Sequence, residues 1–218
     1  MDMTTVSPFQ HRRAAGQALA GLVQPLRDHP RLLVLGLPRG GVPVAYEVAR
    51  ALGAPLDVLL VRKLGHPHHE ELAMGAIASG DILVWNPEIL GAGGIRQAQI
   101  DRVLRRERAE LERREAAYRG EAPPLVLTDA TVLLVDDGLA TGATMEAAVR
   151  AVKSKKPAYL AVAVPVCSTE AAARIHALVD DFIALRTSDQ FCSVGQFYLD
   201  FGQTDDREVR ELLAAAAG

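Results

Sequence analysis

The sequence has little cysteine, few aromatic residues and no long apolar run. Cys167 and Cys192 are its only cysteines, which argues against a disulfide-stapled secreted domain and favours a reducing, cytoplasmic location. It contains no stretch of about 18 uninterrupted apolar residues and no signal-like run behind a basic N-terminus, so we expect no membrane partner. Aromatic residues make up 5% of the chain and apolar residues 49%, so Ala, Val and Leu must fill most of the core.

The chain also lacks a strong excess of either charge. It has 24 Lys and Arg residues against 27 Asp and Glu residues in a length of 218. A dedicated nucleic-acid binder is usually clearly basic, so this balance argues against nucleic acid as a partner. The length fits one α/β domain over residues 1–218, since domains of this class often exceed ~100–200 residues.

Short apolar runs alternate with helical patterns along most of the chain. This alternation predicts βαβ units, and therefore a central, mostly parallel sheet flanked by helices. An Arg- and Glu-rich helix is predicted in the middle, where its charges are typical of a solvated helix face. The expected strands are 31–36, 55–61, 82–85, 131–135, 158–166 and 182–185; the expected helices are 9–28, 42–52, 95–119, 142–153, 169–179 and 207–217; residues 66–80 are predicted to be a long loop or mobile hairpin.

The most informative segment is Thr131-Val-Leu-Leu-Val-Asp-Asp-Gly-Leu-Ala-Thr-Gly-Ala-Thr144. A buried strand delivers Asp136 and Asp137 to its carboxyl end, where open α/β sheets bind their ligands. The small-residue turn that follows exposes backbone N–H groups at a helix start, which favours an anion such as phosphate. Paired carboxylates can accept hydrogen bonds from a vicinal diol, so the segment indicates a ribose 5-phosphate site. The plainer interpretation is that the acids cap a helix or turn.

This segment resembles the phosphoribosyl pyrophosphate (PRPP) signature of the type I phosphoribosyltransferases, in which a hydrophobic strand, two acids and x-Thr-Gly-x-Thr follow one another. The match covers residues 132–144, and the strand–helix order is similar over about 30–186. The resemblance implies that family's fold, with a flexible catalytic loop and a small hood formed by the tail, about 187–218. It also implies that the turn holds the 5-phosphate and the acids hold the ribose hydroxyls. The implied residues are Asp136, Asp137, Ala140, Thr141, Gly142, Ala143 and Thr144.

Two further loops fit a pyrophosphate. The sequence Gly36-Leu-Pro-Arg-Gly-Gly41 follows the first core strand, and it offers free N–H groups and one guanidinium suited to a diphosphate. By the resemblance, Arg39 and Gly40 bind pyrophosphate; a plain strand–helix turn is the alternative. Lys63 stands where the family places a basic residue before its catalytic loop, which closes over the reacting centre and excludes water.

The chemistry implied by the resemblance is phosphoribosyl transfer. The anomeric carbon loses pyrophosphate through an oxocarbenium-like transition state, and a nitrogen of a nucleobase-like acceptor attacks. Mg²⁺, held mainly by PRPP and by Asp136 or Asp137, would stabilise the leaving group together with Arg39 and Lys63. A homodimer is expected by analogy alone.

The acceptor signals conflict. Ala140 stands where 6-oxopurine enzymes keep an aspartate, and the Ala-Thr-Gly form resembles adenine phosphoribosyltransferase. The tail Val194-Gly-Gln-Phe-Tyr-Leu-Asp-Phe201 instead resembles the base-binding tail of hypoxanthine-guanine phosphoribosyltransferase. That resemblance implies acceptor-binding roles for Phe191, Phe197 and Asp200; the alternative is an edge strand of core aromatics.

Other classes of protein compete with the transferase for this sequence. A PRPP-binding regulator with little or no transferase activity is the main alternative. A phosphoryl-accepting receiver domain would carry its acid pair near the N-terminus, and no P-loop sequence occurs. The histidines of the 66–80 segment, with Glu70 and Glu71 beside them, follow no recognised metal-binding spacing, so a polar loop is the simpler interpretation. These histidines are His66, His68 and His69.

Overall fold

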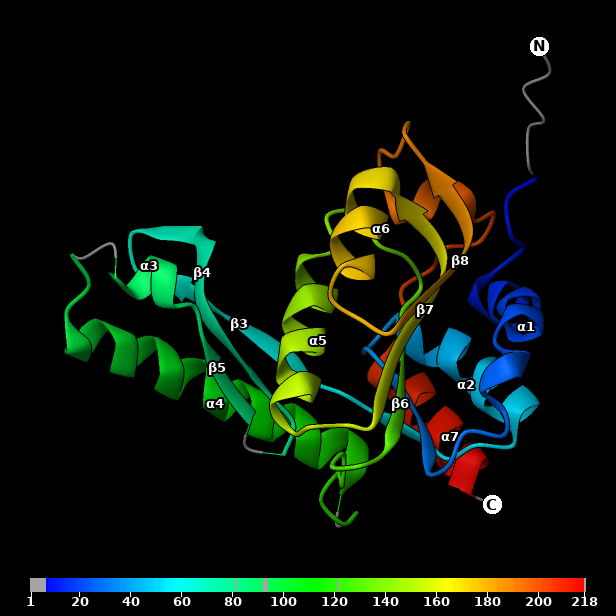
Figure 1. Ribbon diagram of the computed structural model, residues 1–218, viewed down its shortest axis with the longest axis horizontal. Helices are drawn as coiled ribbons and strands as arrows, with labels where there is room; N and C mark the ends of the chain where they lie inside the picture. The colour runs from blue at the N-terminus through cyan, green and yellow to red at the C-terminus, as the bar shows by residue number, and fades with distance from the viewer. Residues whose placement is uncertain (1–6, 81, 92–93, 121, 218) are drawn as a thin grey trace.

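The computed structural model describes residues 7–80, 82–91, 94–120 and 122–217. Its centre is a five-stranded parallel sheet in the order β2-β1-β6-β7-β8 (Figure 1). The predicted α/β fold, with a central parallel sheet flanked by helices, is confirmed. The strands are β1 (Leu32–Gly36), β2 (Leu56–Val58), β6 (Thr131–Val135), β7 (Tyr159–Ser168) and β8 (Asp181–Ser188).

Helices cover both faces of this sheet, because alternate residues of each strand point to opposite sides. In β6, Val132 and Leu134 pack with α5 and α6, whereas Leu133 and Val135 pack with α1 and α2. A strand buried on both faces must be apolar throughout, which explains the uninterrupted apolar runs of the sequence. These helices are α1 (Arg12–Leu22), α2 (Gly41–Leu52), α5 (Ala143–Ser154) and α6 (Thr169–His176).

A second, antiparallel sheet lies beside the first in the order β3-β4-β5. The β3–β4 hairpin accounts for the segment predicted as a loop or mobile hairpin, and it points away from the parallel sheet (Figure 1). The long helix α4 packs along β3 and reaches the C-terminal helix α7. The elements are β3 (Val61–His66), β4 (His69–Ala78), β5 (Ile82–Trp85), α3 (Pro87–Gly91), α4 (Gln97–Arg119) and α7 (Asp206–Ala217).

The prediction of one strand over residues 55–61 is wrong. Strand β2 ends at Val58 and β3 begins at Val61, in a different sheet. Leu59 still donates its N–H to the carbonyl of Gly36 in β1, whereas Leu60 bonds to Ser79 beside the hairpin. The chain therefore changes sheets between two consecutive buried leucines, which apolar periodicity alone does not mark.

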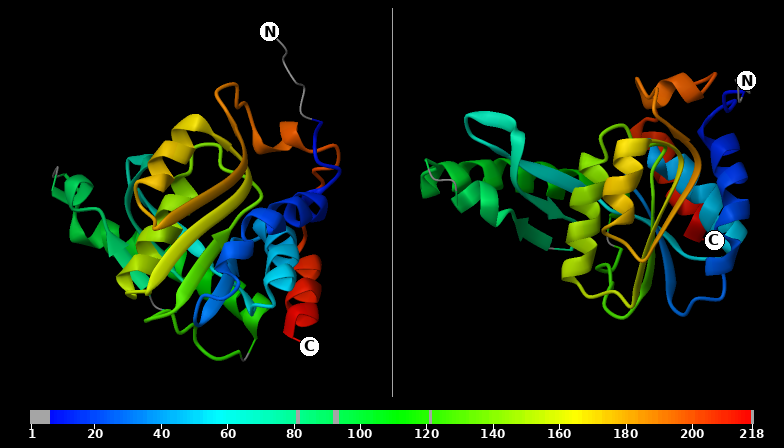
Figure 2. Two further views of the ribbon diagram at one scale, coloured as in Figure 1. Left: turned by 45° about the vertical axis from the view of Figure 1, so that its right-hand side comes forward. Right: turned by 45° about the horizontal axis from the view of Figure 1, so that its top comes forward.

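The tail does not form the edge strand that was the alternative interpretation of its aromatics. Residues Val194–Phe197 form a 3-10 turn, and the tail then pairs with the start of the chain. Phe9 donates its N–H to Phe197 and accepts from Leu199, with N···O distances of 2.8 Å in both cases. Both views in Figure 2 show the tail beside the N-terminal end of α1.

Candidate functional site

Strand β6 presents two adjacent carboxylates at its carboxyl end. The backbone N–H of Asp137 donates to Oδ1 of Asp136 at 2.9 Å. Burial and the charge of Asp137 raise the pKa of Asp136 well above its ordinary value. Burial also raises the pKa of Asp137, although the Arg12 guanidinium partly lowers it. Two such carboxylates are costly to keep charged, so the site favours hydroxyl donors or a cation beside them.

The turn after the acids is open to solvent and leads directly into a helix. Gly142 has φ +74°, in the left-handed region, and α5 begins at the next residue. The side chains before and after it are small and exposed. Backbone N–H groups at a helix start bind anions readily, so the turn can hold a phosphate as the sequence predicts. The residues concerned are Ala140, Thr141, Gly142, Ala143 and Thr144.

The loop between β1 and α2 packs directly against the acid pair. A Cβ atom on Gly40 would lie 2.1 Å from Oδ2 of Asp137. A Cβ atom on Gly41 would lie 2.8 Å from the carbonyl oxygen of Val135. The peptide bond between Pro38 and Arg39 is cis. The fold thus brings the two predicted loops together at one edge of the sheet.

Gly41→Ala should separate these two loops. The added methyl group would meet backbone atoms of Val135 and Asp136 at 2.8 and 2.9 Å. We expect a loss of about 1–3 kcal/mol of unfolding free energy, as for other overpacked sites, and weaker PRPP binding. Urea unfolding and a PRPP titration measure the two effects. Gly21→Ala is the control, because nothing lies within 4 Å of that position on α1; an equal loss there would contradict the argument.

Arg39 lies half-exposed on this loop and faces the start of α7. Its Nη1 is 3.7 Å from Oδ1 of Asp206. The same carboxylate oxygen accepts a hydrogen bond of 2.6 Å from the Tyr118 hydroxyl of α4. The C-terminal helix therefore positions the predicted pyrophosphate-binding guanidinium, a contact that the sequence analysis did not find.

Arg12 is a second site residue that the sequence analysis missed. Its Nε donates to Oδ2 of Asp137 at 2.7 Å, and its Nη1 donates to the carbonyl of Gly202 at 2.6 Å. Its guanidinium carbon also lies 3.9 Å from the centre of the Phe201 ring. Arg12 thus joins α1, the acid pair and the tail. The helical spacing around it indicated only an amphipathic helix.

The structure places the three predicted acceptor-binding residues in two different environments. The rings of Phe191 and Phe197 lie 5.1 Å apart and pack in a small apolar cluster with Phe9 and Tyr198. Asp200 is exposed and lines a cavity of about 590 Å³ that Arg12 also lines. The two phenylalanines come together, whereas Asp200 lies on the cavity side of the tail.

Tyr198 links the C-terminal tail to the backbone of the acid pair by a hydrogen bond. Its buried hydroxyl donates to the backbone carbonyl of Asp137 at 2.6 Å. Tyr198→Phe would leave that carbonyl unpaired, so we expect a loss of about 1–3 kcal/mol of unfolding free energy, measured by urea unfolding. Tyr46→Phe serves as the control, because the Tyr46 hydroxyl makes no hydrogen bond within the described ranges. Equal losses in both variants would contradict this role for Tyr198.

Lys63 does not join the acid pair in this structure. It lies on β3, opposite Ala76 of β4, and lines a separate cavity between the hairpin and α4. The histidine rings of the hairpin turn gather nearby, with the His66 centroid 5.9 Å from that of His68 and 5.4 Å from that of His69. Among the described residues, no group of three or more His, Cys, Asp or Glu side chains could hold a metal ion.

Comparison with known proteins defines the family. Residues 6–201 match the phosphoribosyl transferase domain family. A Mycobacterium tuberculosis H37Rv protein, Rv0571c, provisionally named a phosphoribosyl transferase, is 41% identical over 208 residues; the match covers 95% of this chain and 47% of that protein. The chain therefore spans about half the length of this curated relative. The crystal structure of TT1426 from Thermus thermophilus is 44% identical, with a TM-score of 0.88, over 97% of this chain and 100% of that one.

The chain belongs to the phosphoribosyl transferase domain family, as the match over most of its length shows. The predicted recognition of this family is confirmed, and the fold agrees with it. In the part of the chain that the structure describes, no helix has the length and apolar character needed to cross a membrane.

Proposed function

We propose that this protein transfers ribose 5-phosphate from PRPP to a nitrogenous, nucleobase-like acceptor and releases pyrophosphate. One observation carries the proposal. The acid pair and the Arg39 loop, which lie 95 or more residues apart in the sequence, pack together at the carboxyl edge of the sheet, where Gly40 touches Asp137. The phosphate turn follows the same strand. The three parts of PRPP, its 5-phosphate, ribose hydroxyls and pyrophosphate, each have a matching group there.

Each part of the edge has a distinct role in this proposal. The turn from Ala140 to Thr144 binds the 5-phosphate through backbone N–H groups and the threonine hydroxyls. Asp136 and Asp137 accept hydrogen bonds from the ribose hydroxyls. The Arg39 guanidinium binds the pyrophosphate and stabilises the negative charge that grows as the C1–O bond breaks. The acceptor nitrogen then forms its bond to C1 and loses a proton.

A magnesium ion is part of the proposal. The two carboxylates offer oxygen ligands, the type that Mg²⁺ prefers, and their raised pKa values favour a cation nearby. Since Mg²⁺ commonly keeps substrate phosphates among its ligands, Asp136 or Asp137 would supply only part of its shell. When bound, the ion supplies positive charge to the pyrophosphate oxygens.

The acceptor is proposed to lie between the acid pair and the tail. Phe191 and Phe197 offer aromatic faces there, and aromatic faces stack well on nucleobases. Ala140 has a methyl side chain that cannot exchange a proton with the acceptor. The first acceptors to test are therefore purine bases that can react without giving a proton to the side chain at position 140. A homodimer and a cytoplasmic location stay predictions.

The test is pyrophosphate release from PRPP and Mg²⁺ in the presence of single purines, pyrimidines and other nitrogen acceptors. We expect one acceptor class to release stoichiometric pyrophosphate and to yield the corresponding nucleotide. PRPP hydrolysis without an acceptor is the blank. Tight PRPP binding with no release from any acceptor would contradict the proposal and would favour a PRPP-binding regulator.

Lys63→Ala should lower turnover more than PRPP affinity. The hairpin that carries Lys63 would close over the pyrophosphate during reaction, so its charge acts mainly in the transition state. We expect kcat to fall about tenfold or more, with less change in PRPP Kd, as for removal of one stabilising donor. Steady-state kinetics and PRPP titration measure the two quantities. An unchanged kcat would remove Lys63 from the catalytic residues.

A further inference from the structure

A basic cavity of about 590 Å³ lies between the β3–β4 hairpin and α4. It lies apart from the acid pair, because neither Asp136 nor Asp137 lines it and β3 belongs to the antiparallel sheet; Lys63, which lines it, is shared with the proposed transferase reaction. Its volume is in the range of small-molecule sites, roughly 300–1,000 Å³. The basic side chains and histidines on its walls are Arg62, Lys63, His66, His68, Arg102 and Arg106.

Helix α4 directs one face into this cavity. Gln99, Arg102, Val103 and Arg106 are spaced three, four and seven positions apart, so they share one side of the helix. Gln99 also reaches across to the hairpin turn, where its Nε2 lies 3.1 Å from Nε2 of His68. The cavity therefore has two walls from different elements and a polar bridge at its rim.

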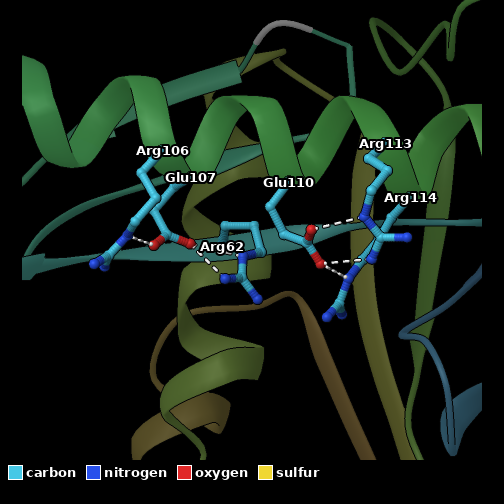
Figure 3. Close-up of polar contacts among 6 residues, drawn as sticks. All are labelled: Arg62, Arg106, Glu107, Glu110, Arg113 and Arg114. Atoms are coloured by element: carbon cyan, nitrogen blue, oxygen red, sulfur yellow. Dashed lines mark hydrogen bonds and ion pairs between the residues drawn. The ribbon is translucent and has the colours of Figure 1, made fainter.

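The described side chains of the cavity walls carry more positive than negative charge. Among the lining residues whose side chains the structure describes, Glu107 is the one acid, and it is buried. Nε of Arg62 and Nε of Arg106 each donate to it at 2.8 Å (Figure 3). One carboxylate neutralises one guanidinium charge, so one arginine charge of this trio is left without an acid among the described lining residues.

On the next turn of α4, the arginines are paired with an acid, unlike Arg102. There Glu110 sits between Arg113 and Arg114 (Figure 3). Their hydrogen bonds lower the pKa of Glu110 to about 2. Arg102, by comparison, makes no hydrogen bond or ion pair with any residue in the described ranges. Arg102 therefore brings to the cavity a guanidinium charge that no described side chain neutralises.

We propose that this cavity binds a small polyphosphate-type anion, one with at least two negative phosphoryl groups. Arginine guanidinium groups suit phosphate oxygens because they donate two parallel hydrogen bonds. Arg62 and Arg106, held by Glu107, present fixed donors, and Arg102 on the same face adds a third guanidinium. His66 accepts the N–H of His68 at Nδ1, so its neutral ring carries its proton on Nε2 as a further donor.

The experiment is calorimetric titration with inorganic tripolyphosphate. It uses the full chain carrying Arg39→Ala, which removes the cation of the pyrophosphate loop and leaves the cavity unchanged. Two double variants are compared in that background. Arg102→Ala with Arg106→Ala removes two cavity charges, and Arg105→Ala with Arg108→Ala removes two charges of the same helix that do not line the cavity.

We expect one bound tripolyphosphate in the parent and in the Arg105/Arg108 variant, with affinity at least tenfold weaker in the Arg102/Arg106 variant, about the effect of a lost charge-assisted contact. Equal binding in both double variants, or an equal loss in both, would overturn the proposal, the second because it shows only general surface charge. Arg102→Ala alone repeats the test without releasing Glu107. PRPP affinity of the Arg102/Arg106 variant in the wild-type background tests the transferase site separately; a normal value there leaves the proposed function intact whatever the cavity does.

Discussion

Replacing both acids, as Asp136→Asn with Asp137→Asn, should abolish stabilisation by PRPP. A ligand at about 100 times its Kd stabilises a fold by about 2.7 kcal/mol. For a chain of this size that corresponds to a Tm increase of roughly 5–10 °C. We expect this increase in the wild type with millimolar PRPP and Mg²⁺, and none in the double variant. The physical reason is that amides replace the carboxylates that accept from the ribose hydroxyls and attract the cation.

The control for this experiment lies at the other end of the same strand. Asp129 is an exposed acid two residues before β6, with φ +55°, a conformation that asparagine adopts readily. Asp129→Asn should keep the full PRPP-dependent increase in Tm. Circular dichroism of the unliganded double variant checks that it is folded, since Asn preserves the side-chain volume. A PRPP effect that survives in the folded double variant would contradict the assignment of the acid pair.

Arg12→Ala should give the largest change in the stability of the unliganded protein. The Arg12 and Asp137 side chains are 12% and 13% exposed, so the substitution leaves a nearly buried carboxylate without its counterion. Removing one partner of such a pair costs about 3–5 kcal/mol. Urea unfolding at neutral pH measures the loss. The tail should loosen as well, because Arg12 also bonds to Gly202 and lies over Phe201.

The pH dependence of the stability loss in Arg12→Ala distinguishes the contribution of the Arg12–Asp137 ion pair from that of the other contacts of Arg12. Burial already raises the pKa of Asp137, and Arg12 opposes that effect. Without Arg12 the pKa rises further, so the carboxyl group becomes neutral as pH falls through the raised value. The penalty of the unpaired charge is therefore present at high pH and disappears at low pH. We expect the difference between wild type and Arg12→Ala to be larger at pH 8 than at pH 5.

Two further variants complete this test. Arg12→Lys keeps the positive charge, so its loss should be smaller and its pH dependence weaker. Adding Asp137→Asn to Arg12→Ala should recover part of the lost stability, as a double-mutant cycle of a coupled pair requires. A loss in Arg12→Ala that is the same at pH 5 and pH 8 would show that packing, and not charge, determines the role of Arg12.

The sequence by itself determined the parallel sheet and the position of its ligand-binding edge. Residues 131–135 are a strand as predicted, because a strand buried on both faces needs an unbroken apolar run. The acids and the glycine turn after it are also local features, since Gly142 takes its positive φ within the same short segment. Local sequence was sufficient wherever the physical requirement lay within one element and its turn.

Only the tertiary structure decided which distant groups meet at that edge. Arg12 reaches Asp137 across 125 positions of sequence, and Arg39 faces Asp206 at the start of the last helix. The chain also leaves one sheet for another between Leu59 and Leu60, both apolar and buried. Helical spacing and apolar content indicate which face of a helix or strand is buried, but they do not indicate which other element packs against that face. The pairing of charges and the docking of the tail depend on packing across the whole chain, so they appear only once it is folded.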